Sequence, residues 1–109
     1  MNDTASKIRE LNDLLRTKMI GGKFMISAGL SAEGQKTVAK VLQAVRSFKN
    51  FNQNNDPYKE HDMGIVNIDA KNYIWKIDYY DLDYMYHSPD AANPLVTKRV
   101  LTICKDIEY

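Results

Sequence analysis

Hydrophobic residues recur at intervals of three and four in two segments of the first half of the chain, which is the spacing of an amphipathic helix. In the first segment they are Ile8, Leu11, Leu14, Leu15 and Met19. Asp3 or Thr4 can cap this helix, and Gly21-Gly22 ends it. In the second segment, which we expect to begin at a Ser31 cap, they are Val38, Val41, Leu42, Val45 and Phe48. Between the two helices, the short apolar run from Lys23 to Ala28 predicts a strand.

The middle of the chain changes from an irregular pattern to an alternating one. Phe51 to Gly64 is dense in Asn, Asp and Pro, which favour local turns, so we predict a long loop there. Ile65 to Asp69 and Asn72 to Tyr80 are rich in β-branched and aromatic residues and predict a hairpin that turns near Ala70-Lys71-Asn72. Alternation along the second strand assigns one set of side chains to the core: Tyr73, Trp75, Ile77 and Tyr79.

The last third of the chain predicts one further strand and one further helix. Leu82, Tyr84 and Tyr86 alternate within Asp81 to Asp90, which favours an edge strand. Asn93-Pro94 is typical of a helix start, and the following apolar residues have helical spacing: Val96, Val100, Ile103 and Ile107. Cys104 would then be a small buried hydrophobic residue of this helix.

These elements predict an α+β fold in which three helices pack on one face of a small, mainly antiparallel sheet. The chain has 109 residues, 44% of them hydrophobic and 27% charged, which favours a single globular domain over residues 1–109. A lone cysteine excludes an intramolecular disulfide, and no apolar stretch is long enough for a signal peptide or a membrane span. We therefore expect a cytoplasmic protein that needs no cofactor to fold.

The net charge of +1 conceals an uneven distribution of charged residues. Residues 1–50 contain nine Lys/Arg against four Asp/Glu, whereas residues 51–93 contain three against eight. Solvated surface charge is the common explanation for such a pattern, and we do not expect the basic helices to bind nucleic acid. The acidic middle of the chain fits a cation or a basic partner better than a phosphate backbone.

The densest group of reactive side chains lies in the predicted loop and after the aromatic strand. It contains Asp56, Glu60, His61 and Asp62, followed by Asp78 and Asp81. Carboxylates with an imidazole can hold a divalent cation or carry out acid–base chemistry, which makes His61, Asp62 and Asp78 a candidate metal site. Adjacent residues do not easily point at one ion, however, and no two-histidine or paired-cysteine motif is present.

Aromatic residues give the same region a second candidate role. Trp75 falls in the core set, whereas Tyr58 in the loop and Tyr80 on the opposite face of the strand are free to contact a partner. We interpret His87 with Ser88-Pro89-Asp90 as part of a turn rather than a catalytic triad.

Four segments resemble a bacterial family, domain of unknown function 3768. They are NDPYKEHDMG at residues 55–64, WKIDYYD at 75–81, SPD at 88–90 and TKRVLTI at 97–103. The similarity is expected to run from about Ile8 to Tyr109, with Lys59 and Met63 in place of Gly and Phe. The resemblance implies no established activity; it implies a small accessory or anti-defence protein of mobile elements that acts by binding.

The sequence therefore favours a non-enzymatic module that binds an unidentified protein, as a monomer or a homodimer. The predicted binding residues are Asp56, Tyr58, Glu60, His61, Asp62, Asp78, Tyr80 and Asp81. The alternative is a metal-dependent hydrolase or nuclease that uses Glu60, His61 and Asp62 with Asp78 or Asp81. Nucleic-acid binding through the basic helix faces is a third hypothesis.

Overall fold

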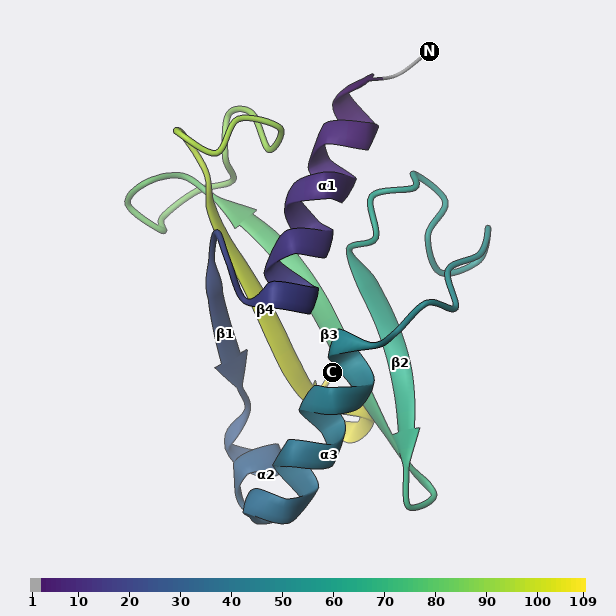
Figure 1. The fold of residues 1–109 in the computed structure, drawn as a ribbon. Helices are drawn as coiled ribbons and strands as arrows, with labels where there is room; N and C mark the ends of the chain where they lie inside the picture. Colours follow the sequence, from purple (N-terminus) through teal and green to yellow (C-terminus); the bar gives the residue numbers. More distant parts are fainter. Residues whose placement is uncertain (1–2) are drawn as a thin grey trace.

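The computed structural model describes residues 3–109, in which the long helices lie in the first half of the chain and three of the four strands in the second half (Figure 1). They are α1 (Asp3–Lys18), β1 (Lys23–Ile26), α2 (Ala28–Ser31), α3 (Gln35–Arg46), β2 (Met63–Ile68), β3 (Lys71–Tyr80), β4 (Lys98–Lys105) and the final 3-10 turn η1 (Asp106–Glu108). The strands form one sheet in the order β1-β4-β3-β2. β1 is parallel to β4, and the other two pairs are antiparallel. The predicted α+β fold is confirmed.

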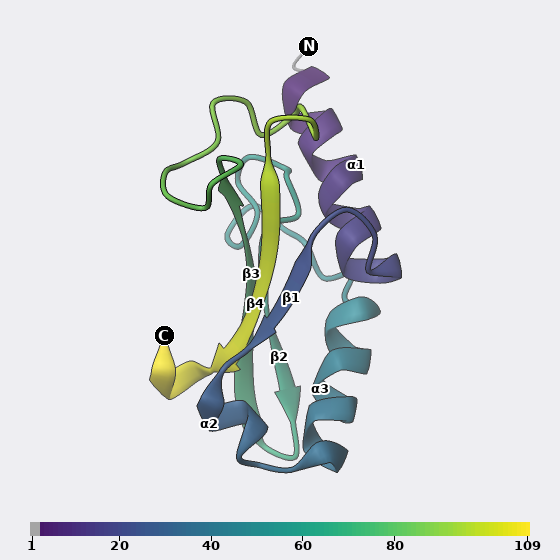
Figure 2. The ribbon, with the colours of Figure 1, turned by 90° about the vertical axis from the view of Figure 1, so that its left-hand side faces the viewer.

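The helices lie on one face of the sheet, and the connection after β3 and the C-terminal turn lie on the side of the opposite face (Figure 2). The core fills the space between the helices and the sheet. Its buried residues are Leu15, Leu30, Val41, Val45, Val66, Tyr73, Trp75, Ile77, Leu101 and Ile103. The alternation predicted for β3 is confirmed, because Tyr73, Trp75 and Ile77 are buried in this core. Tyr79 packs against its margin.

The predicted C-terminal helix is wrong, because residues Lys98–Lys105 form the central strand β4. Val100 and Ile103 fit a helical period by coincidence, since the segment is inserted between β1 and β3 and pairs with both. Two pairing partners satisfy the backbone groups that a helix would satisfy internally, so tertiary context overrides the local pattern. Asn93 instead closes a turn, accepting a hydrogen bond from the Val96 amide. Cys104 is only half-buried, on β4 rather than on a helix.

Three smaller predictions also need correction. Asp81 to Asp90 is not a strand; it forms turns, with a single bridge between Tyr80 and His87. Ser31 does not cap the second long helix, since it ends the short α2, which Ser27 caps, and α3 begins after Gly34. The hairpin turns earlier than expected, at Asp69-Ala70, where both residues have the positive φ angles of 52° and 68° that a tight two-residue hairpin requires.

Helix α1 buries a different stripe from the one the hydrophobic residues predict. Leu14 and Met19 are exposed, whereas Asn12 and Arg16 are buried beside Leu15. Two polar residues therefore face the sheet, and each must find hydrogen-bond partners there. Within residues 3–109, no helix is both long and apolar enough to cross a membrane.

Gly64 on β2 marks the tightest approach in the core. A Cβ at this position would lie 2.7 Å from Trp75 Nε1 and 2.8 Å from Phe48 Cζ. Both neighbours belong to rings packed edge to face, with centroids 5.5 Å apart, so neither side chain can bend away easily.

We predict that Gly64→Ala destabilises the protein by about 1–3 kcal/mol, as expected when a methyl group is forced into a filled core. Urea unfolding followed by circular dichroism measures the change. Asn67→Ala, on the exposed side of the same strand, is the control and should change stability little. A Gly64→Ala variant as stable as the wild type would show that this contact is not tight in solution.

Candidate functional site

Asp56 organises the connection between α3 and β2. Its side chain is buried, with 6% of its surface exposed, and Oδ1 accepts hydrogen bonds from the amides of Glu60 (2.9 Å) and His61 (3.0 Å). These bonds close the turn in which Lys59 and His61 adopt positive φ angles of 58° and 55°. Lys59 therefore occupies a left-handed backbone conformation that glycine adopts at a lower energetic cost.

His61 is held on three sides. Its ring stacks on Phe51 with centroids 3.7 Å apart, and Nδ1 lies 2.9 Å from Asp13 Oδ1 on α1. Nε2 lies 3.7 Å from Asp56 Oδ2. Both ring nitrogens thus face carboxylates of the protein itself, which makes His61 a link between α1 and the loop.

Arg16 joins α1 to the end of α3. Nη1 donates to the carbonyls of Val45 (3.0 Å) and Phe48 (2.9 Å), and Nη2 donates to Asp13 (3.2 Å). The guanidinium also lies over the Trp75 ring, 5.4 Å from its centroid. A cation at the carbonyl end of a helix is favourable, and burial strengthens the interaction.

A second buried chain of polar contacts runs from α1 to the sheet. Asn12 accepts from Arg99 Nε (2.7 Å) and donates to both the Glu60 carbonyl (3.0 Å) and Tyr79 Oη (2.8 Å). Tyr79 Oη in turn donates to Glu60 Oε1 (3.1 Å). Arg99 also donates to the carbonyl of Ala91, so the same chain fixes the connection before β4.

A pocket of about 330 Å³ opens where the loop meets the end of β3. Asp62, Asp78 and Tyr80 line it from the loop and the strand. Met85, Tyr86 and His87 line it from the connection after β3, and Met85 and Tyr86 are 70% and 71% exposed. Asp62 is fixed by its backbone, since its carbonyl accepts from the Ile77 amide (2.7 Å).

The connection after β3 is shaped by Asp81. Its amide donates to the Tyr86 carbonyl (2.8 Å), and its carboxylate accepts from the Met85 amide (3.0 Å). Tyr84 completes the turn with a φ of 59°. Asp81 therefore positions Met85 and Tyr86 at the pocket without lining it.

Two carboxylates of this region, Glu60 and Asp62, have a raised pKa. Burial raises the pKa of Glu60, an effect that the hydrogen bond from Tyr79 only partly offsets. Burial also raises the pKa of Asp62, and the nearby charges of Asp56 and Asp78 raise it further. A carboxylate kept near others in a pocket is a frequent property of binding and catalytic sites.

The structure thus separates the predicted cluster into parts. Asp62, Asp78 and Tyr80 share the pocket, whereas Asp56 and His61 line a separate hollow with Arg9 and Phe51. Glu60 faces Tyr79, Tyr58 is 77% exposed, and Asp81 holds its turn. Within residues 3–109, no three His, Cys, Asp or Glu side chains form a group that could hold a metal ion.

Sequence reasoning missed the residues that hold this site in place: Asn12, Asp13, Arg16, Phe51 and Arg99. A pattern of polar residues in α1 would have found two of them, since Asn12 and Arg16 follow the buried Ile8 at steps of four. It also missed His87 and Met85 as pocket residues, because nothing in the sequence shows that residues 85–87 fold back beside Asp62.

Comparison with protein families gives one finding. The model of a family described as a protein of unknown function, DUF3768, matches residues 26–108. The chain belongs to the DUF3768 family. The match begins at Ile26 rather than near Ile8, so it covers the loop, the hairpin and β4 but leaves out α1. The DUF3768 segment thus contains the pocket, whereas Asn12, Asp13 and Arg16 lie outside the match. Neither the curated proteins nor the solved structures give a match.

The raised pKa of Asp62 has a consequence for stability. A carboxyl whose pKa is higher in the folded state destabilises the fold where it is ionised, and this penalty disappears as the pH falls below its ordinary pKa of 3.8. We predict that Asp62→Asn is more stable than the wild type at neutral pH and equally stable at about pH 3, where the carboxyl is protonated in both states.

Urea unfolding across this pH range measures the difference. Asp83→Asn, an exposed residue of the neighbouring turn, is the control and should leave stability unchanged at both pH values. An Asp62→Asn variant that is less stable than the wild type at neutral pH would contradict the prediction, because it would show that the charge is stabilised by partners.

Proposed function

We propose that the protein is a non-enzymatic binding module that holds a basic side chain of a protein partner in the pocket between the loop and the end of β3. One observation carries this proposal: Asp62 and Asp78 line a single pocket together with Tyr80 and Tyr86. The charge of Asp78 raises the pKa of Asp62, and a bound cation would relieve this repulsion.

The walls of the pocket favour a lysine or, better, an arginine. A guanidinium can pair with carboxylates through several hydrogen bonds and can stack on aromatic rings at the same time. Lys76 lies 3.4 Å from Asp78 Oδ1, so this carboxylate is already paired on one side. Among the described residues, no Lys or Arg side chain forms an ion pair with Asp62. Its neighbour His61 acts on it electrostatically, but the His61 ring nitrogens lie beside Asp13 and Asp56.

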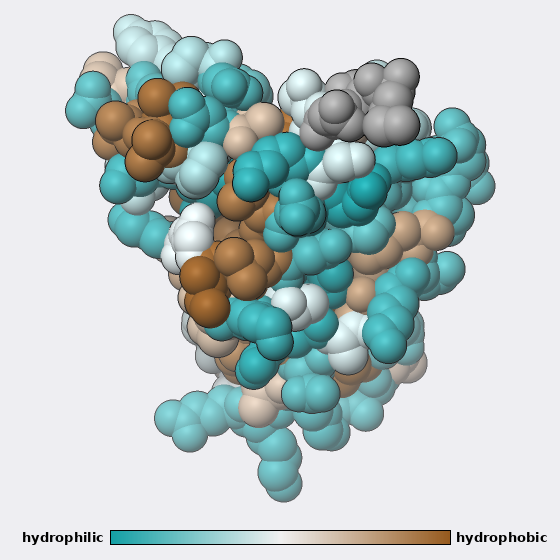
Figure 3. Space-filling model, turned by 45° about the horizontal axis from the view of Figure 1, so that its top comes forward, coloured by the Kyte–Doolittle hydropathy of each residue, from teal (hydrophilic) through white to brown (hydrophobic). Residues whose placement is uncertain are grey.

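The surroundings of the pocket favour a protein over a nucleic acid. Acidic residues repel a phosphate backbone, whereas exposed apolar side chains on the connection between β3 and β4 can bury area against a protein. Leu82, Met85 and Leu95 are 52%, 70% and 81% exposed. Hydrophobic surface gathers over this connection at the upper left of Figure 3.

The alternative of a metal-dependent hydrolase has weaker support. His61, its proposed ligand, has both ring nitrogens beside Asp13 and Asp56 and would have to leave them to reach an ion near Asp62 and Asp78. We also propose a bacterial protein that serves mobile elements as an accessory or anti-defence factor, which the family resemblance alone supports. A cytoplasmic location is proposed from the lone cysteine and the lack of a long apolar stretch in the sequence.

Nuclear magnetic resonance titration tests the pocket with a small probe. We predict that acetyl-arginine amide shifts the backbone amide signals of Asp62, Asp78, Tyr80 and His87. Acetyl-citrulline amide, which has the same shape without the charge, should shift them far less, because charge-assisted hydrogen bonds contribute about 1.5–3 kcal/mol each.

Asp78→Asn should weaken arginine binding by roughly tenfold, whereas the matched control Asp83→Asn should not change it. Added salt should weaken binding in the wild type, since the contact is electrostatic. Equal shifts from the two probes, or arginine shifts located away from the pocket, would contradict the proposal.

A further inference from the structure

We propose that two copies of this chain associate through β1, pairing antiparallel to form one continuous sheet across both molecules. β1 is an edge strand of the sheet, and in Figure 2 it lies in front, with no other segment across it. An edge strand presents unpaired backbone groups and is a natural site for strand addition.

The hydrogen bonds of β1 show which groups are free. The Ser27 amide donates to the Ile103 carbonyl (3.0 Å), so in this parallel ladder the backbone groups of residues 23, 25 and 27 face β4. Those of Phe24 and Ile26 face away from the sheet. Within residues 3–109 they have no partner, so four backbone groups on this edge are available to a second strand.

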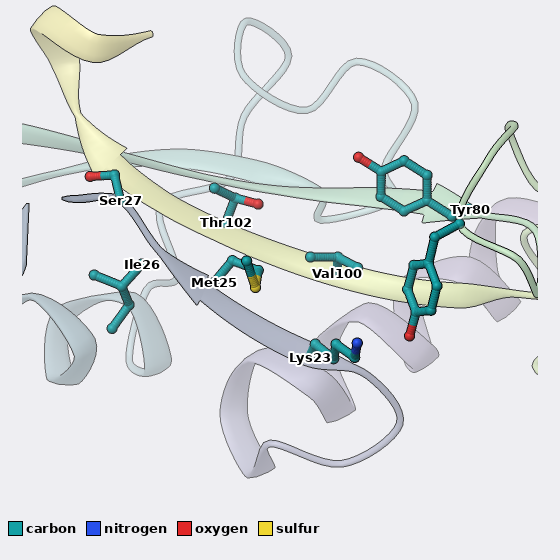
Figure 4. A pocket seen from close by; sticks show the side chains of 8 residues that line it. Lys23, Met25, Ile26, Ser27, Tyr80, Val100 and Thr102 are labelled. Atoms are coloured by element: carbon teal, nitrogen blue, oxygen red, sulfur yellow. The ribbon is translucent and has the colours of Figure 1, made fainter. Parts of the chain in front are cut away.

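An antiparallel pairing centred on Met25 satisfies all four groups at once. Phe24 of one copy then lies opposite Ile26 of the second copy, and the symmetry repeats the pair on the other side. Met25 lies opposite itself on the twofold axis, and both side chains emerge on the face without helices. Met25 is 53% exposed, and Figure 4 shows it on that face beside Val100 and Thr102. Pairing would bury these two methionines against each other.

Charge complementarity identifies the occupant as a second copy rather than an unrelated strand. In this register Lys23 lies opposite Ser27 of the second copy. The Ser27 hydroxyl donates to Glu108 Oε1 (2.7 Å), so each Ser27 carries a carboxylate beside it. Hydrogen bonds from the Lys105 amide and from Ser27 lower the pKa of Glu108, which keeps it charged. Because the pairing is symmetric, each Lys23 comes close to the charged Glu108 carboxylate of the other copy, and the dimer contains this contact twice.

The ends of β1 leave room for this pairing. Gly21 and Gly22 precede the strand, and Ala28 and Gly29 begin the helix that follows it. Only small residues, Ser27 among them, therefore flank the two ends of β1. β2, the other edge strand, has no charged residue between Met63 and Ile68 and offers no such complementarity. No residue of β1 lines the Asp62 pocket, so this inference stands apart from the proposed function.

Disulfide trapping tests the register directly. Two residues opposite each other in a pair without mutual hydrogen bonds have Cα atoms about 4.5 Å apart, within the range of roughly 4.4–6.8 Å that a disulfide spans. We expect Met25→Cys, in a Cys104→Ala background, to form a covalent dimer in air. Ile65→Cys on β2, which is 56% exposed, is the control and should stay monomeric under the same conditions.

Sedimentation velocity over a range of concentrations tests the unmodified interface. The wild type should show a reversible dimer, and Met25→Lys should abolish it by placing two ammonium groups on the twofold axis. Ile65→Lys should leave it unchanged. Lys23→Glu should weaken the dimer at least tenfold, whereas Lys36→Glu on α3 should not. Two results would overturn the proposal: a wild type that stays monomeric up to about 1 mM, or a dimer that Ile65→Lys dissociates and Met25→Lys does not.

Discussion

The buried hydrogen bond between Asn12 and Arg99 constrains most of the structure around the candidate site. Two polar side chains without access to water must satisfy nearly all of their donors and acceptors inside the protein. Asn12 does so by contacting the loop carbonyl of Glu60 and the Tyr79 hydroxyl, and Arg99 by contacting the carbonyl of Ala91. One residue of α1 thus fixes both long connections, which lie far apart in sequence.

This constraint explains why the acidic and histidine residues of the loop do not act as one group. Because α1 holds the loop through Asn12 and through Asp13, the His61 ring turns toward the helix and Phe51. Its neighbour Asp62 turns toward the end of β3 instead. Adjacent residues therefore serve different purposes: one braces the fold, and the other contributes charge to a pocket.

Much of the fold was predictable because every second residue of β3 from Tyr73 to Tyr79 is large and apolar or aromatic, so Trp75 could be assigned to the core from the sequence alone. β4 was not, since the apolar residues of 96–107 fit a helix as well as a strand and only pairing with β1 and β3 decides between them. At the site, the sequence alone indicated Asp62, Asp78 and Tyr80 as candidate binding residues. Their partners on α1 were not, because contacts such as that between Asn12 and Arg99 depend on how separate elements pack.

Thermal melting of the wild type and His61→Ala, each with and without Mg²⁺, Mn²⁺ or Zn²⁺ after treatment with a chelator, tests most directly whether the loop is a structural brace. His61→Ala should lose about 1–3 kcal/mol of stability through its lost contacts with Asp13 and Phe51. We expect the same loss with and without ions, and no effect of ions on the wild type. A rise of several degrees in the wild type that disappears in His61→Ala would contradict this expectation, because it would show that His61 binds a metal ion in the folded state.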